Sequence, residues 1–275
     1  MGTAEAAQAT RASGRLVTQP AVLAALLGAL ALAGWITLWW WSASPYAGYL
    51  GHAGWSDASA FAALCRAVPQ GAILIPALLH ASGWVLMLAA MMLPTTYPLL
   101  AMFARIAAAR PDGSRLMLLV VSGFLAVWFA FGLVAHAVDA ALGAIASRSA
   151  WLAIHGGIVG AGVLAAAGLF QFSALKYRCL EECHAPFGFV SSRWHGRSPA
   201  REAIRLGVDH GLFCVGCCWA LMLLMFVVGM GSVGWMLALA VVMAAEKNLP
   251  WGRRLRTPLG AGLLAWSAVL VAGQL

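Results

Sequence analysis

Long apolar stretches separated by short polar segments run along the whole of this 275-residue chain. A helix that crosses a bilayer needs about 20 consecutive, mostly apolar residues. The pattern therefore predicts an all-α fold, a polytopic membrane helix bundle of about seven transmembrane helices. The sixth and seventh apolar stretches are shorter than the others. The seven stretches cover residues 21–41, 72–93, 116–138, 151–172, 206–230, 232–245 and 258–272.

Composition indicates that lipid is the main solvent of the chain. Hydrophobic residues make up 63% of the sequence, charged residues make up 9%, and the mean hydropathy is +0.86. A soluble domain carries roughly 25% charged residues, because its surface faces water. We therefore expect residues 1–275 to form a single transmembrane domain embedded in the lipid bilayer. Its longest cytoplasmic loop is predicted at residues 173–205.

Basic residues predict the orientation of this bundle. Short cytoplasmic loops hold an excess of Lys and Arg. With seven spans, all but two of the 17 Lys and Arg residues fall on one side, and the exceptions are Arg66 and Arg148. The N-terminus is therefore expected in the cytoplasm, in a multi-pass protein of a bacterial inner membrane. Orientation and anionic lipid headgroups explain the net charge of +8, so no nucleic-acid partner is expected.

Five of the six cysteines lie between residues 179 and 218, interleaved with His184 and His210. Residues three or four apart share one face of a helix, and two sets of these side chains have that spacing. The cytosol keeps thiols reduced, which argues against structural disulfides. Soft sulfur ligands favour Cu(I), with zinc as the next candidate. The predicted metal ligands are Cys179, Cys183, His184, His210, Cys214, Cys217, Cys218 and Met222.

The cysteines and histidines of the chain also have structural interpretations, without a metal. A lone buried cysteine behaves as a small hydrophobic residue, and we interpret Cys65 in this way. Five cysteines within forty residues are much harder to explain by packing. His184 and His210 could instead cap or bridge a helix end.

Two other segments are candidates for the surroundings of the cysteines. Pro94 interrupts the second apolar stretch, and irregular backbone at membrane depth is tolerated only where it is buried in protein or lines a cavity. Residues 91–96 are therefore a predicted constriction or wall of the site. Glu246 and Lys247 are expected at the level of the lipid headgroups, with Glu246 as a candidate acceptor for a metal ligand. The outer half holds a separate set that could form a metal vestibule, a proton relay or ordinary interfacial groups: His80, His136, Asp139 and His155.

Several short motifs carry a resemblance. They are residues 171–176, Cys179 and Cys183 before Pro186, residues 209–222, Glu246–Lys247 before Pro250, and residues 91–95. In these motifs the chain resembles a bacterial family of predicted metal-binding integral membrane proteins, a domain of unknown function. The resemblance covers most of residues 80–260 and is specific in the cysteine segment. It implies a metal-binding membrane protein and supplies neither a substrate nor a catalytic residue. His184 stands where we expect this family often to have a basic residue.

Three functions follow as hypotheses. The first is binding of a soft metal ion, copper before zinc, with transport or handover of the ion to a soluble metallochaperone or another membrane subunit. The second is an enzyme, a membrane thiol oxidoreductase that uses Cys214 and Cys217. The third is a scaffold subunit that transports nothing. The apolar, reducing surroundings of the cysteines favour the first hypothesis over the enzyme, since no thioredoxin-like context is present.

Overall fold

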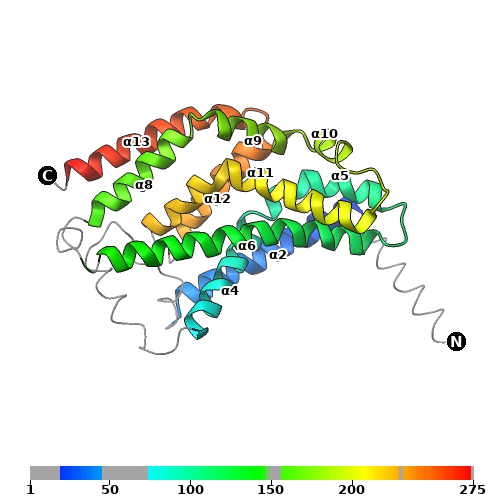
Figure 1. Ribbon diagram of the computed structural model, residues 1–275, viewed down its shortest axis with the longest axis horizontal. Helices are drawn as coiled ribbons and strands as arrows, with labels where there is room; N and C mark the ends of the chain where they lie inside the picture. Colours follow the sequence, from blue (N-terminus) through cyan, green and yellow to red (C-terminus); the bar gives the residue numbers. More distant parts are fainter. Residues whose placement is uncertain (1–18, 45–73, 147, 149–155, 229–231, 274–275) are drawn as a thin grey trace.

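The computed structural model of the protein describes residues 19–44, 74–146, 148, 156–228 and 232–273. Every regular element within these ranges is a helix, which confirms the all-α prediction (Figure 1). In chain order the helices are α2 (Pro20–Ser42), α4 (Leu74–Met91), η2 (Pro94–Thr96), α5 (Tyr97–Ala107), α6 (Gly113–Ala146), α8 (Gly156–Phe170), α9 (Ala174–His184), α10 (Pro186–Ser191), α11 (Pro199–Val228), α12 (Val233–Asn248), η3 (Gly252–Arg254) and α13 (Arg256–Ala272).

Several of these helices are long and apolar enough to cross a membrane. Four qualify alone: Pro20–Ser42, Gly113–Asp139, Pro199–Met225 and Gly252–Ala272. Two bent pairs raise the number to six if each pair is one span. The 16 residues of α12 span about 24 Å at 1.5 Å per residue, less than the roughly 30 Å of a hydrocarbon core. A membrane location is thus supported, and the count of seven stays a prediction.

The first bent pair joins α4 to α5 through η2, with an angle of 40° between the helices. Pro94 has no backbone N–H to donate, so the helical ladder is interrupted there. The neighbouring threonines compensate, because Thr95 Oγ1 donates to the carbonyl of Met92 and Thr96 Oγ1 to that of Leu93, each at 2.7 Å. The break is therefore satisfied within the chain, as irregular backbone inside a membrane must be.

The second bent pair joins α8 to α9 at an angle of 63°. Ser173 caps α9, because its side chain accepts a hydrogen bond from the backbone N–H of Lys176. Residues 173–205 were predicted as a loop, yet this segment contains α9, α10 and the start of α11. The expected helical turn around Cys179 is confirmed. It belongs to a helix that folds back against its neighbours rather than to a straight extension of α8.

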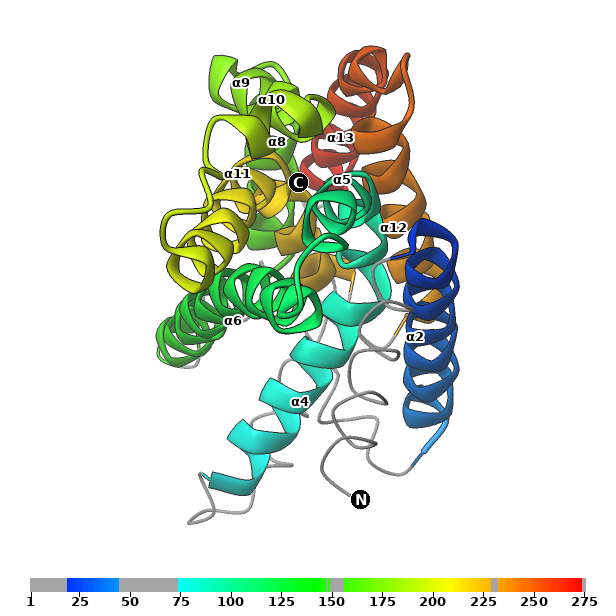
Figure 2. The ribbon, with the colours of Figure 1, turned by 90° about the vertical axis from the view of Figure 1, so that its right-hand side faces the viewer.

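Small residues permit the closest helix crossings. A Cβ at Gly207 of α11 would collide with the backbone of Val120 in α6, and a Cβ at Gly123 would collide with Ile204. Membrane helices often approach through such residues, since lipid provides no hydrophobic force between them. Figure 1 shows α8 beside α13 and α2 beside α4, with α11 and α12 between these pairs. The view from the end in Figure 2 places α11 between α6 and the α8–α13 pair.

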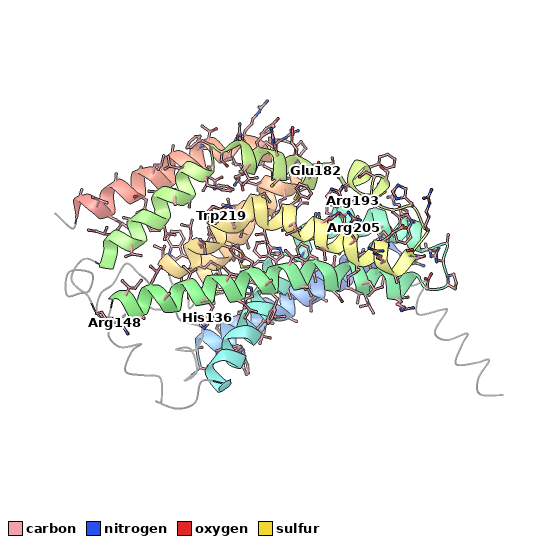
Figure 3. The ribbon with its side chains drawn as sticks, viewed as in Figure 1. His136, Arg148, Glu182, Arg193, Arg205 and Trp219 are labelled. Atoms are coloured by element: carbon pink, nitrogen blue, oxygen red, sulfur yellow. The ribbon has the colours of Figure 1, made fainter. Side chains whose placement is uncertain are left out.

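The charged ends of the bundle can be followed in Figure 3. Arg193 and Arg205 lie at one end of the long axis, near α9 and α10, whereas Arg148 lies at the opposite end. This separation matches the division of basic residues expected from the sequence. Which end faces the cytoplasm stays a prediction.

Candidate metal centre

Three thiols of the candidate site come from the middle of α11. Cys214, Cys217 and Cys218 are each no more than 1% exposed. The Sγ atoms of Cys217 and Cys218 lie 3.3 Å apart, and the Cys217 thiol donates to the carbonyl oxygen of Cys214 at 3.2 Å. All five cysteines among the described residues are free thiols. The helix therefore presents reduced sulfur to a dry interior.

Helix α9 adds two thiols to the same region. A Cβ at Gly216 would lie 2.6 Å from Cys179 Sγ, so only glycine allows α9 to approach α11 this closely. Cys183 lies one turn further along α9 and interacts through its side chain with Cys217. Cys179 is buried, whereas Cys183 is half-buried. The prediction that both thiols point the same way is confirmed, since both face α11.

A buried lysine also contacts the thiols. Lys247 is 4% exposed, and its Nζ donates to Cys214 Sγ at 2.9 Å. The same ammonium reaches Thr95 Oγ1 at 3.4 Å and Met92 Sδ at 3.7 Å. The broken segment at residues 91–96 is therefore a wall of this site, as expected. The depth of Lys247 relative to the lipid headgroups stays a prediction, and α12 directs this side chain into the bundle.

A second buried lysine forms an ion pair beside the first. Lys176 Nζ donates to both carboxylate oxygens of Glu246, at 2.7 and 3.0 Å, and the two side chains are 0% and 1% exposed. Glu246 was also expected at headgroup level and within reach of a metal ligand. Instead its carboxylate is engaged by Lys176. Burial makes such a pair costly to form and costly to break by removing one partner.

The two candidate histidines have other partners. His184 Nε2 lies 2.7 Å from the carbonyl oxygen of Glu246, so this nitrogen joins α9 to α12. His210 packs between the rings of Phe124 and Phe189, with centroid separations of 5.7 and 5.6 Å. Its Nδ1 atom has no hydrogen-bond partner within the part of the chain that the structure describes. These contacts link His184 to the backbone and His210 to aromatic rings rather than to the thiols.

The remaining candidates divide by location. Met222, one turn beyond Cys218, is fully buried. Half-buried His136 lies on α6, far along the bundle from Arg193 in Figure 3. Cys65, His155 and the side chain of His80 lie outside the described residues. The outer vestibule thus stays a prediction.

The donor set is chemically suited to a soft ion. Thiolates and thioethers select Cu(I), and lysine ammonium groups next to thiols can balance their negative charge. Over the described ranges, no group of three or more His, Cys, Asp or Glu side chains has the arrangement of a ready metal site. The thiols of Cys183, Cys214, Cys217 and Cys218 are neighbours, and a metal would have to draw them together.

Sequence reasoning missed Lys176, Lys247 and Trp128. Both lysines were counted as orienting charges, although each adjoins residues at the site. Trp128 is fully buried on α6, interacts with the Cys214 side chain, and makes no hydrogen bond through Nε1 among the described residues. The available signal for Lys176 was its position three residues before Cys179, close to one helical turn away. Nothing comparable marks Trp128.

Fold and site together define a helical membrane-type protein with a thiol-rich interior. The family comparison is more specific: residues 81–270, which exceed half of the chain, match the PpoB2 family, described as a copper chaperone. The chain therefore belongs to this family. Searches of curated proteins and of solved structures gave no significant match. The metal-related family expected from the motifs is confirmed, and the family favours copper, with no support for zinc.

Proposed function

We propose that this protein is an integral membrane copper handler that binds Cu(I) through its buried thiols and passes the ion to a partner. The observation that carries the proposal is the group of neighbouring, reduced and buried thiols of Cys183, Cys214, Cys217 and Cys218. Membership of a copper chaperone family supports copper as the ion. Soft donors in a water-poor interior suit Cu(I), which also accepts fewer ligands than zinc usually does.

Cys183 is the proposed exchange ligand of the site. It is the half-buried member of the group, while the three thiols of α11 are fully enclosed. An incoming thiol or thioether could bond to the copper ion as the bond to Cys183 breaks, and the ion would keep its charge throughout. Release is helped when several sites each bind weakly. The acceptor is proposed to be a soluble metallochaperone or another membrane subunit.

Anaerobic titration of the purified full-length chain tests this function. The protein in detergent would compete with a chromophoric Cu(I) chelator, alongside the variants Cys214→Ser, Cys218→Ser and the control Cys65→Ser. The two α11 variants should lose most of their Cu(I) affinity, and the control should keep it. Equal affinity in all four proteins would contradict the proposal.

A separate measurement tests the handover step. Cys183→Ser should still bind copper through the α11 thiols but transfer it more slowly to an excess of acceptor chelator. Transfer at the wild-type rate would remove Cys183 from the proposed path.

A thiol oxidoreductase is the second candidate. The contact between Lys247 and Cys214 favours it, because an adjacent cation activates a thiol. Against it, Cys214 is 0% exposed and a protein disulfide could not reach its sulfur without local opening. Trapping of a mixed disulfide by Cys217→Ser, with no effect of that variant on copper content, would reverse the ranking of the two functions.

A further inference from the structure

The two buried lysines beside the thiols differ in their partners. Lys176 is neutralised by the carboxylate of Glu246. Within the described ranges, the polar atoms in contact with Lys247 Nζ are a thiol, a hydroxyl and a thioether, and none of them belongs to a carboxylate. One positive charge is thus placed against sulfur in the interior of the bundle.

A buried charge is costly unless a nearby group compensates it. Cys214, the closest acceptor at 2.9 Å, would provide this compensation in its thiolate form, which is the form of cysteine that binds metals. The buried indole of Trp128 interacts with the same side chain, although its Nε1 has no hydrogen-bond partner among the described residues. The ammonium of α12 is therefore the donor that the structure places against this sulfur of α11.

We propose that Lys247 sets the charge selectivity of the site, favouring a monovalent over a divalent soft metal ion. This inference rests on the copper-binding function proposed above. A metal bonded to Cys214 at about 2.3 Å would lie within about 5 Å of Lys247 Nζ. Coulomb repulsion scales with the charge of the ion, so the ammonium opposes a divalent ion twice as strongly as a monovalent one.

The charge balance of the interior leads to the same selectivity. Two thiolates and one monovalent ion leave a single negative charge, which the Lys247 ammonium balances. A divalent ion on the same two thiolates would leave a net positive charge in a buried site, and removing it would require a third thiolate or loss of the Lys247 proton. The Lys176–Glu246 pair contributes no net charge. Lys247 thus acts through charge, without being a ligand of the metal.

Affinities of two monovalent and two divalent soft ions, Cu(I), Ag(I), Zn(II) and Cd(II), test the inference on the purified full-length chain. Lys247→Leu removes the charge and adds no metal ligand, and Lys247→Gln serves as a second neutral variant if the first does not fold. Lys247→Arg retains the charge. Arg253→Gln is the matched control, because it removes an exposed cation that pairs with Glu181 outside the site.

We expect both neutral variants to lower the monovalent-to-divalent affinity ratio by about tenfold or more, both for Cu(I) relative to Zn(II) and for Ag(I) relative to Cd(II). Lys247→Arg and Arg253→Gln should keep the wild-type ratio. An equal change in all four affinities would overturn the inference while leaving copper binding intact, since it would indicate a purely structural lysine. A wild-type protein that binds none of the four ions would contradict both the proposed function and this inference.

Discussion

At the scale of single residues, the site is defined by charges and thiols that share a dry interior. Lys176 and Glu246 neutralise one another, while Lys247 is directed at the sulfur of Cys214. These two sequence neighbours therefore contact different helices, because Glu246 faces α9 and Lys247 faces α11. Because these groups are buried, leaving any of their charges unpaired would cost more free energy than it would at the surface.

The Lys176–Glu246 pair yields a stability prediction. Lys176→Met leaves the Glu246 carboxylate buried without its partner, which should destabilise the protein by about 3 kcal/mol or more. Thermal unfolding in detergent, followed by circular dichroism, should show a lower Tm for this variant.

A double variant is the control for that prediction. Lys176→Met combined with Glu246→Gln removes both charges together, so much of the lost stability should return. An unchanged Tm in the single variant would mean that the carboxylate finds another partner or water.

At the scale of elements, the site depends on how closely α9 lies against α11. Gly216 provides the space, and α9 is held in place by Lys176 and His184 through their contacts with Glu246 of α12. The 63° bend after α8 makes this return of the chain possible. Cys179 and Cys183 reach the α11 thiols only because of that bend.

Gly216→Ala tests this packing. The added Cβ would lie 2.6 Å from Cys179 Sγ, so α9 must shift and the Tm should fall. Combining it with Cys179→Ala removes the clashing sulfur, and the double variant should recover part of the loss. Gly162→Ala is the matched control, because a Cβ there meets no atom within 4 Å.

The Tm should fall more for Gly216→Ala than for Gly162→Ala. A Tm loss for Gly162→Ala as large as that for Gly216→Ala would mean that helix flexibility, rather than contact with α9, explains the effect.

Sequence patterns predicted the helices far better than they predicted the contacts among them. Apolar length located helices, and Pro94 marked a real break next to the site. The pairing of Lys176 with Glu246 joins residues 70 positions apart, and helical periodicity carries no information on such distances. For the same reason the contact of Lys247 with Cys214 was not predicted. The cysteine spacing did indicate one shared face, because a helix repeats locally.

At the scale of the whole molecule, the bundle separates a charged end from the thiol-rich interior. Arg193 and Arg205 lie at one end, and Arg148 lies at the other (Figure 3). This is the distribution expected of a protein oriented by its basic loops. Among the described residues, four helices, or six with both bent pairs, meet the length and hydropathy needed to cross a bilayer.

Reporter fusions at the two ends of the chain test the count of spans. Seven spans place the N- and C-termini on opposite sides, whereas an even number places them on the same side. We expect a reporter that is active only outside the cytoplasm to be active at the C-terminus and silent at the N-terminus. Equal activity at both ends would show that α12 or one of the bent pairs does not cross the membrane.

The most direct test of copper binding by the interior thiols is X-ray absorption at the copper edge, on full-length protein loaded with Cu(I) without oxygen. The wild type should hold near-stoichiometric copper with sulfur as its nearest neighbours. A variant with Cys214, Cys217 and Cys218 all changed to Ser should lose the copper. A wild type that stays empty, or a triple variant that keeps copper in the same sulfur environment, would contradict the copper site assigned to α11.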